Sequence, residues 1–568
     1  MNANSDMQWR PAQEVMQLDR LGSFHASRLS FMRTLLRRVM NEQWQITPSV
    51  FDLDSNGYGS VVYRIQAAHG VYSFVVFSNY LEPDNRNDRV IAEQWDLTMT
   101  LCEGEVSEEY LAVLRENVPK QEAGRMDSKA LVLSRANRSA RNFDYVVDCL
   151  AKGEQPDVDK LVKVGYLYRT TAVYGSGKFG LADWQKVLTS LPDFAAPFAA
   201  EMFTCYMLRE FSVVQAQHIA TARAPDAAVD LNDELRRYLG IGNSTGLGMA
   251  PYLIHHPLLI AKWIETRETA LAAILSVPDE VVEKLNQLIG LLKQSDQHFK
   301  EVFVDDEWQA SKNKTLSVDL KTLLNFLSDQ GPRFRNWSDL LEVVDDQVGL
   351  DAQELLRALL LELYPDIVDP LADDMTVFED YRLDSSMPVK HAIALIEQHY
   401  QWALNTDFEQ TDERYLFWYR SEEKSEPRLG VRGEDDGEEL QMPLGIALAV
   451  QQVHQNLLNW HEITVASEKE RVLAEFLLDK PEYRSVLRRV LTLCGQRYGD
   501  IHANILNKDL MPVHLLRCKL AFFGVSKFDP RSRLWLRNTM YQGAPLLKEI
   551  GKPYADDWYF PVAPSAAG

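Results

Sequence analysis

The sequence predicts an α+β protein that is predominantly α-helical and has an antiparallel β-meander near its N-terminus. Three observations predict this. Between residues 48 and 104, β-branched and aromatic residues form short runs separated by turns, as in adjacent strands. From about residue 135, apolar residues recur at the three- and four-residue spacing of amphipathic helices. Helix boundaries fall at residues suited to them, such as Ser107 at a start and Gly153 at an end.

The elements follow in order. Residues 25–42 have a helical apolar stripe, and strands are expected at 50–54, 60–66, 71–77 and 95–105, with AAHG as a hairpin turn. A capped helix at 107–118 follows. Residues 195–222 are apolar on almost every side in their first half, which predicts a buried central helix. Further helices are expected near 262–275, 279–303, 315–329, 336–347, 350–363, 388–401, 443–460 and 484–498, with an exposed loop at 421–440.

The length of 568 residues predicts more than one core, because single cores stop growing near about 250–300 residues. We expect an N-terminal α+β region with the meander at 1–120. A central helical region carrying two Gly-rich segments is expected at 121–345. A C-terminal helical region with a basic, aromatic tail is expected at 346–568.

The net charge of −22 disfavours nucleic acid and anionic membranes as partners. From Lys480 to the end, however, 14 Lys and Arg face 7 Asp and Glu. This basic tail either docks on the acidic body or supplies cations to an anionic ligand. The five cysteines form no CxxC pair and the N-terminus has no apolar signal region, so a reducing, cytoplasmic location is predicted.

The most site-like segment is residues 238–261, which contain no charged residue. Glycines expose backbone N–H groups and allow close approach of a ligand, and hydroxyl and amide side chains add hydrogen bonds. With a helix starting at Pro251, the segment is predicted to be a loop that binds an anionic group at a helix N-terminus. The alternative is a buried turn between two helices. The candidate binding residues are Gly240, Gly242, Asn243, Ser244, Thr245, Gly246 and Gly248.

The glycine spacing is G-x-G-x-x-x-G-x-G and follows a predicted helix, so it differs from the dinucleotide-binding fingerprint. Within the same segment, His255 and His256 are candidate general bases because histidine titrates near neutral pH. The alternative for each is a hydrogen-bonded core histidine. Adjacent helical residues point about 100° apart, so the pair is a poor metal site.

A second Gly-rich segment, residues 166–180, contains GSGK. It is not a P-loop, because Ala172 and Phe179 occupy two of the required positions. Its basic and hydroxyl side chains still suit a carboxylate or phosphate. The alternative is a solvated loop. The candidates here are Arg169, Thr170, Thr171, Tyr174 and Lys178.

Other motifs fail on spacing. Residues 52–57 begin like a calcium loop, but Tyr63 stands where a bidentate Glu is needed. No strand lysine follows the glycines at 57–59, which argues against a kinase. No metal site is predicted and the cofactor is unknown. The predicted function is a cytoplasmic enzyme acting on a small or medium anionic metabolite. The alternative is a non-catalytic interaction or assembly protein. A homo-oligomer is compatible with either.

Overall fold

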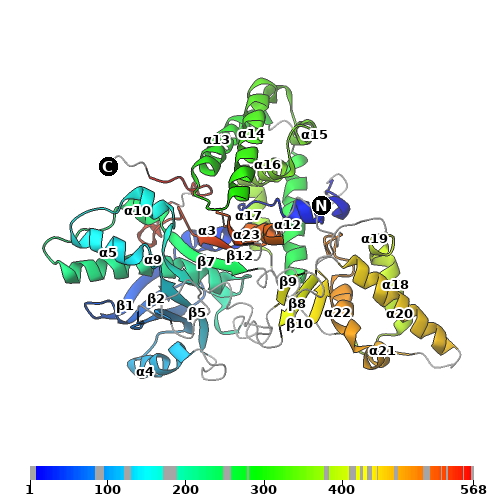
Figure 1. Ribbon diagram of the computed structural model, residues 1–568, viewed down its shortest axis with the longest axis horizontal. Coiled ribbons are helices and arrows are strands. Elements are labelled where there is room, and N and C mark those ends of the chain that lie inside the picture. Colours follow the sequence, from blue (N-terminus) through cyan, green and yellow to red (C-terminus); the bar gives the residue numbers. More distant parts are fainter. Residues whose placement is uncertain are drawn as a thin grey trace.

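The computed structural model describes residues 8–82, 95–120, 129–170, 189–246, 257–277, 281–375, 383–407, 417–421, 427–430, 438–443, 446–465, 471–502, 512–525, 527–532, 535–553 and 556–564. The predicted α+β fold, mostly helical with an N-terminal antiparallel meander, is confirmed (Figure 1).

Within the described residues, nine strands form one sheet in the order β1-β2-β3-β4-β5-β6-β7-β12-β11. All neighbours are antiparallel except β6 and β7, which run parallel. The strands are β1 (Gln45–Leu53), β2 (Gly59–Gln66), β3 (Val71–Ser78), β4 (Leu97–Glu103), β5 (Ala130–Arg138), β6 (Tyr166–Thr170), β7 (Gly240–Gly246), β11 (Asp529–Ser532) and β12 (Trp535–Met540).

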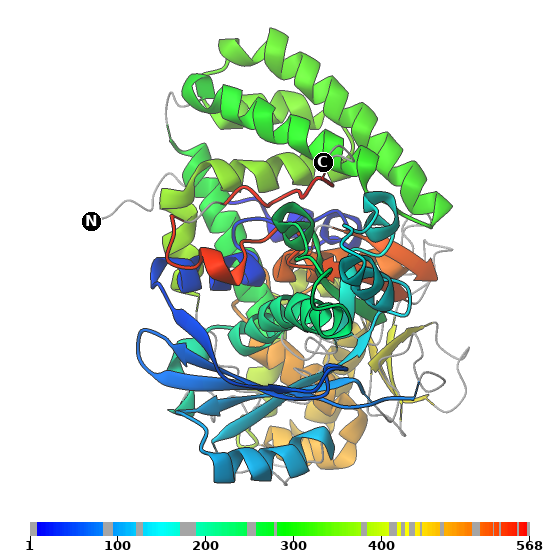
Figure 2. The same ribbon diagram turned by 90° about the vertical axis from the view of Figure 1, so that its left-hand side faces the viewer.

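The four-stranded meander is confirmed as β1–β4, and the sheet is covered on both faces there. Helix α4 (Glu108–Asn117) begins where predicted, with the Ser107 hydroxyl accepting a hydrogen bond of 3.2 Å from the backbone N–H of Tyr110. Its Leu111 and Leu114 pack against Val62 and Val75 to form a small separate core. Figure 2 shows α4 on one side of the sheet and helix α9 (Ala199–Arg223) on the other.

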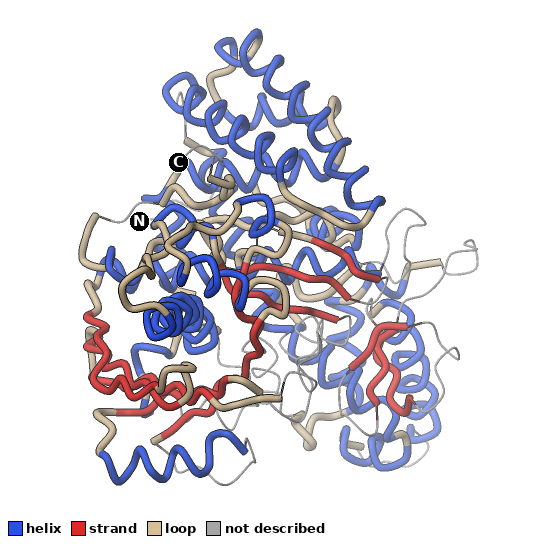
Figure 3. Tube along the Cα trace, turned by 60° about the vertical axis from the view of Figure 1, so that its left-hand side comes forward, coloured by secondary structure: helices blue, strands red, loops and turns tan. Residues whose placement is uncertain are grey.

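The predicted central helix is α9, and most of its residues are buried. The sheet curls around it, and Figure 3 shows this helix almost end-on inside the curve of the strands. It packs against β5, β6 and β7. At its other end Gln215 donates a hydrogen bond of 2.7 Å to the carbonyl of Gly57 in the β1–β2 turn. The long apolar face of this one helix therefore organises the main core.

Helices make up most of the remaining chain. The group α13–α16 stands at the top of Figure 1. The helices that pack around the sheet and in this group are α1 (Ala12–Val15), α2 (Leu18–Leu21), α3 (Phe31–Asn41), α5 (Phe143–Ala151), α6 (Val158–Val162), α10 (Asp233–Tyr238), α12 (Pro257–Leu275), α13 (Val281–Glu301), α14 (Glu307–Asp329), α15 (Trp337–Asp345), α16 (Leu350–Leu363), α17 (Pro365–Asp373) and α23 (Leu516–Phe523).

A second core lies between the helices at the lower right of Figure 1 and contains Ile396, Val453 and Phe476. These helices are α18 (Val389–His399), α19 (Gln401–Leu404), α20 (Ala447–Val465), α21 (Leu473–Asp479) and α22 (Arg484–Leu493). A three-stranded sheet of β8 (Phe417–Ser421), β9 (Pro427–Gly430) and β10 (Glu438–Pro443) lies beside them. The predicted exposed loop at 421–440 therefore contains strand residues.

The large sheet takes strands from all three predicted regions, since β1–β4 precede residue 120, β5–β7 lie in the central region and β11–β12 come from the tail. The boundaries at 120 and 345 stay predictions. None of the helices that the structure describes is long and apolar enough to cross a membrane.

Candidate functional site

The Gly-rich segment is not a loop where the structure describes it. Residues Gly240–Gly246 form strand β7, which pairs in parallel with β6 and in antiparallel with β12. Helix α10 ends at Tyr238, and only Leu239 separates it from β7, so the alternative of a turn between two helices is also wrong for residues 240–246. The segment becomes a strand because the tail strand β12, almost 300 residues later in the chain, supplies its second hydrogen-bonded neighbour.

Two of the glycines are needed for close packing. A Cβ atom at Gly240 would lie 2.3 Å from the carbonyl oxygen of Met540. A Cβ atom at Gly242 would lie 2.7 Å from Cγ of Arg169 and from the ring of Tyr166. The side chain of Arg169 therefore crosses the strand directly over Gly242. Glycine here lets a cationic side chain lie flat against the backbone.

The predicted binding residues divide between the two faces of the sheet. Asn243 is buried on the α9 face, on the same side as Ile241, and its Nδ2 donates a hydrogen bond of 3.0 Å to the carbonyl of Thr170. The hydroxyl of Thr170 is 2.8 Å from that of Ser134. These two residues hold β5, β6 and β7 together. Arg169 lies on the opposite face with Gly242.

The tail brings three cations to that opposite face: Lys527, Arg531 and Arg537, called the basic cluster below. Arg537 on β12 stands opposite Ser244 of β7 and Asp529 of β11 in the strand register. Arg531 pairs with Asp305 in the loop before α14, and its Nη1 is 3.5 Å from Oδ2 of Asp529.

Two members of the basic cluster, Arg537 and Lys527, are buried without a described partner. The side chain of Arg537 is only 7% exposed, yet within the described part of the chain it forms no hydrogen bond and no ion pair. Lys527 is 4% exposed and likewise has no hydrogen bond or ion pair to a described residue, although its Nζ lies 5.8 Å from the ring centroid of Phe303. Two residues along β12, the buried hydroxyl of Thr539 also lacks a described hydrogen-bond partner.

Burial and charge shift the titration of this cluster in opposite directions. Burial lowers the pKa of Lys527 to about 8. For Asp529 burial has the opposite effect and raises the pKa, although the neighbouring cations act to lower it. A hydrogen bond from Arg531 lowers the pKa of Asp305. Among the residues that the structure describes, the three cations of the basic cluster face two carboxylates, Asp305 and Asp529, which leaves an excess of positive charge.

Several predicted residues cannot be placed. His255, His256, Gly248, Thr171, Tyr174 and Lys178 lie outside the described residues. Ser244, Thr245 and Gly246 are described only as backbone of β7. The sequence did not single out Arg537 or Lys527 individually. The excess of basic residues after Lys480 is the only sequence feature that indicates them. One interpretation of that excess is that the tail supplies cations to a ligand.

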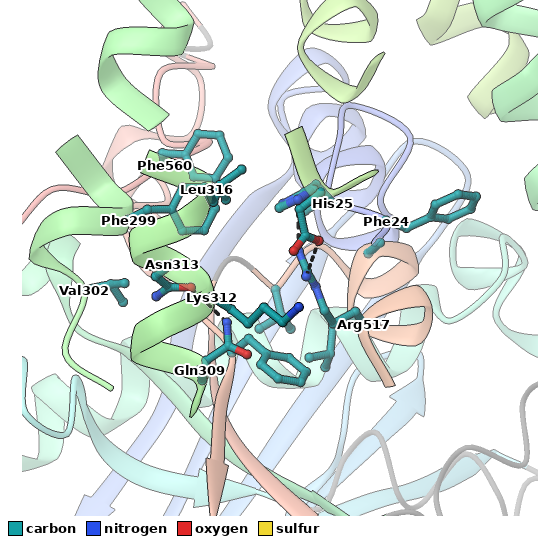
Figure 4. Close-up of a pocket in the computed structure, with 16 residues that line it drawn as sticks. Phe24, His25, Phe299, Val302, Gln309, Lys312, Asn313, Leu316, Arg517 and Phe560 are labelled. Carbon is teal, nitrogen blue, oxygen red and sulfur yellow. Dashed lines mark hydrogen bonds and ion pairs between the residues drawn. The ribbon is translucent and has the colours of Figure 1, made fainter. Parts of the chain in front are cut away.

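A separate cavity lies next to this region, and Phe528, between Lys527 and Asp529 in the sequence, is one of the residues that line it (Figure 4). His25, Asp351 and Arg517 form its polar end. Arg517 Nη1 is 2.5 Å from the carboxylate of Asp351, and Nη2 is 2.9 Å from Nε2 of His25. Burial and the charge of Arg517 lower the pKa of His25 to about 3, so this histidine is neutral.

No group of three or more His, Cys, Asp or Glu side chains suited to a metal ion occurs among the residues that the structure places. Comparison with models of protein families, with curated proteins and with solved structures finds no match for this chain.

Proposed function

We propose that this protein is an enzyme acting on a small or medium anionic metabolite, and that the basic cluster beside the Gly-rich strand binds the carboxylate or phosphate of that metabolite. The observation that carries the proposal is the side chain of Arg537, which is only 7% exposed, has no hydrogen bond or ion pair to a described residue and keeps its Nε buried without a partner. Arg537 stands in the strand register beside the segment that the sequence marks as site-like.

Burying the charges of Arg537 and Lys527 costs free energy. A guanidinium or ammonium group taken out of water is destabilising unless an opposite charge and hydrogen bonds accompany it. Arg537 and Lys527 are both almost fully buried, and the described part of the chain supplies two carboxylates for the three cations of the cluster. An anion would complete the site, and the planar fork of arginine matches the geometry of a carboxylate or phosphate.

The neighbouring groups suit such a ligand. Gly240 and Gly242 lie on the same face as Thr539, and the absence of their side chains lets neighbouring groups pack closely there. Arg169, which crosses Gly242, adds a further positive charge on that face. In this proposal His255 or His256, which follow β7 by about ten residues, moves a proton on the bound metabolite. The five cysteines are free thiols, which supports a reducing compartment and hence the cytoplasm.

Calorimetric titration with inorganic phosphate and with acetate tests the proposal. The wild-type protein should bind at least one of them. The variant Arg537→Met should bind it about 10-fold or more weakly, because a charge-assisted hydrogen bond contributes about 1.5–3 kcal/mol. Without ligand the same variant should be slightly more stable, since an unpaired buried charge has been removed.

The matched control is Arg333→Met, which removes an exposed arginine outside the cluster and should leave binding unchanged. Equal affinity in the wild type and Arg537→Met would contradict the proposal. So would a large loss of stability in Arg537→Met, because it would show a structural arginine. Absence of any binding would favour the non-catalytic assembly protein instead.

A further inference from the structure

Lys527, Asp529 and Arg537 lie together on one side of the tail segment that leads into β11. Phe528, between the first two in the sequence, lines the separate cavity. Because side chains alternate along an extended chain, Lys527 and Asp529 point to the opposite side from Phe528. Arg537 stands opposite Asp529 in the β11–β12 register. The three side chains are 4%, 1% and 7% exposed, so an amine, a carboxyl group and a guanidinium are buried side by side.

The buried amine of Lys527 is the first reactive group. Its Nζ forms no hydrogen bond or ion pair with a described residue and lies 5.8 Å from the ring centroid of Phe303. Burial and the charge of Arg537 lower the pKa of Lys527 to about 8, although Asp529 acts to raise it. At neutral pH the neutral amine is therefore roughly 100-fold more abundant than on an ordinary exposed lysine. A lysine that is desolvated beside another cation is a nucleophile towards carbonyl groups.

The carboxyl group of Asp529 is the second reactive group. Its Oδ1 accepts a hydrogen bond of 3.2 Å from the backbone N–H of Asp305. Its Oδ2 is buried and has no hydrogen-bond partner in the part of the chain that the structure describes, although Nη1 of Arg531 is 3.5 Å away. Burial raises the pKa of Asp529. The Oδ2 atom is therefore available to hold a proton and to donate it to a ligand beside Lys527.

Solvent reaches the edge of this group at Asp305. The side chain of Asp305 is 40% exposed and pairs with Arg531. Its charge acts on Lys527, and the charge of Arg537 acts on Asp305 in turn, so all of these groups are close together. A small ligand therefore has a short path from solvent to the buried groups. Ordered water can hydrogen-bond to them, but it does not offset the excess of positive charge, whereas an anion does.

These positions define the ligand. Lys527 and Arg537 flank the same side chain, Asp529, so an anion held by Arg537 must have its reactive carbon next to its anionic group. A carbonyl group bonded directly to a carboxylate meets this condition. We propose that Lys527 forms an imine with the carbonyl carbon of a short 2-oxo acid whose carboxylate pairs with Arg537. Imine formation depends on the proposed function, since the 2-oxo acid is then the anion that the basic cluster binds.

The covalent step balances with the groups present. The neutral Nζ of Lys527 attacks the carbonyl carbon, and a proton passes from nitrogen to the carbonyl oxygen to give a carbinolamine. Protonated Asp529 then donates its proton to the new hydroxyl group, which leaves as water while the nitrogen lone pair forms the C=N bond. The products are a protonated imine and the Asp529 carboxylate. Such an imine withdraws electrons from the neighbouring carbon, so it suits reactions that move a proton or make or break a carbon–carbon bond there.

Reductive trapping of the full-length protein tests the proposal. Glyoxylate, the smallest 2-oxo acid, has as many heavy atoms as phosphate. With glyoxylate and sodium cyanoborohydride at about pH 7.5, peptide mapping by mass spectrometry should find a carboxymethyl group on Lys527. Labelling should be about 10-fold or more greater than on Lys314, an exposed lysine. Saturating phosphate should suppress the labelling of Lys527 and not that of Lys314. An unlabelled Lys527, or equal labelling of the two lysines, overturns the proposal.

Variants separate recognition of the carboxylate from reactivity of the amine. Arg537→Met should lower labelling of Lys527 by glyoxylate about 10-fold or more, and should lower labelling by propanal, which has a carbonyl but no carboxylate, much less. Asp529→Asn should slow labelling by both aldehydes. An equal loss with both aldehydes in Arg537→Met overturns the proposal.

The proposed function and the imine can fail separately. Phosphate binding that depends on Arg537, together with an unlabelled Lys527, overturns only the imine. Absence of phosphate and acetate binding, together with equal labelling of Lys527 by both aldehydes, contradicts both.

Discussion

The side chain of Lys527 is almost fully buried. Its titration should therefore make anion binding depend on pH. Its pKa is lowered to about 8 by burial. Sulfate keeps the same charge between pH 6.5 and 9.5, so its affinity for the basic cluster should fall as Lys527 loses its proton above pH 8. Titrations of sulfate at several pH values measure this. In Lys527→Met the affinity should be lower and nearly independent of pH; a flat profile in the wild type would contradict the assignment.

The lowered pKa of Lys527 also makes the free energy of unfolding depend on pH. Its pKa in the folded protein lies below the ordinary value of 10.5, so the unfolded chain binds more protons between about pH 8 and 10.5. Without ligand, the contribution of Lys527 to the free energy of unfolding therefore rises with pH in that range. A bound anion should oppose this trend, because it favours the charged lysine.

At the scale of elements, β7 depends on residues without side chains. Replacement of Gly242 by Ala places a Cβ atom 2.7 Å from Arg169 and Tyr166. Overpacking of this kind costs about 1–3 kcal/mol, and it should displace Arg169. We expect a lower melting temperature for Gly242→Ala. Gly290→Ala in the middle of α13 is the control, because nothing lies within 4 Å of its Cβ position and alanine favours helix; equal effects of the two changes would show that β7 is not crowded.

The fold was predictable from the sequence where neighbours in space are also neighbours in the chain. The meander β1–β4 and helix α4 follow from local alternation and capping, and α9 from an apolar surface on nearly every side. Strand β7 was not predictable, because glycine has low strand preference and its partner β12 comes from the tail. For the same reason the sequence indicates a basic tail but not Arg537 itself, because its place beside Ser244 is set only by the β7–β12 register.

At the scale of the whole molecule, a buried ion network joins distant segments. Glu354 of α16 is fully buried and accepts hydrogen bonds of 2.7 Å from Arg10 and Arg20 near the N-terminus and from Arg267 of α12. Arg10 and Arg267 also pair with Glu268. The network therefore attaches the N-terminal segment to the helical half of the protein.

Removing the charge of Glu354 should destabilise this attachment. Glu354→Gln keeps the shape of the side chain but leaves three arginines facing a single buried carboxylate, Glu268. Breaking a buried pair in this way costs about 3–5 kcal/mol. Thermal unfolding should show a clear decrease for Glu354→Gln and almost none for Glu342→Gln, which changes an exposed carboxylate on α15. A melting temperature unchanged by Glu354→Gln would mean that the network does not hold these segments together.

We expect the nearly buried side chain of Arg537, whose Nε has no described hydrogen-bond partner, to bind an anion. The most direct test is a crystal structure of the protein grown with phosphate and a second grown without it. We expect phosphate oxygens within hydrogen-bonding distance of the Arg537 guanidinium and beside Lys527, and an Arg537 without a protein partner when phosphate is absent. A phosphate-free structure in which Arg537 pairs with a carboxylate of the protein, or a phosphate complex in which this site is empty, would contradict it.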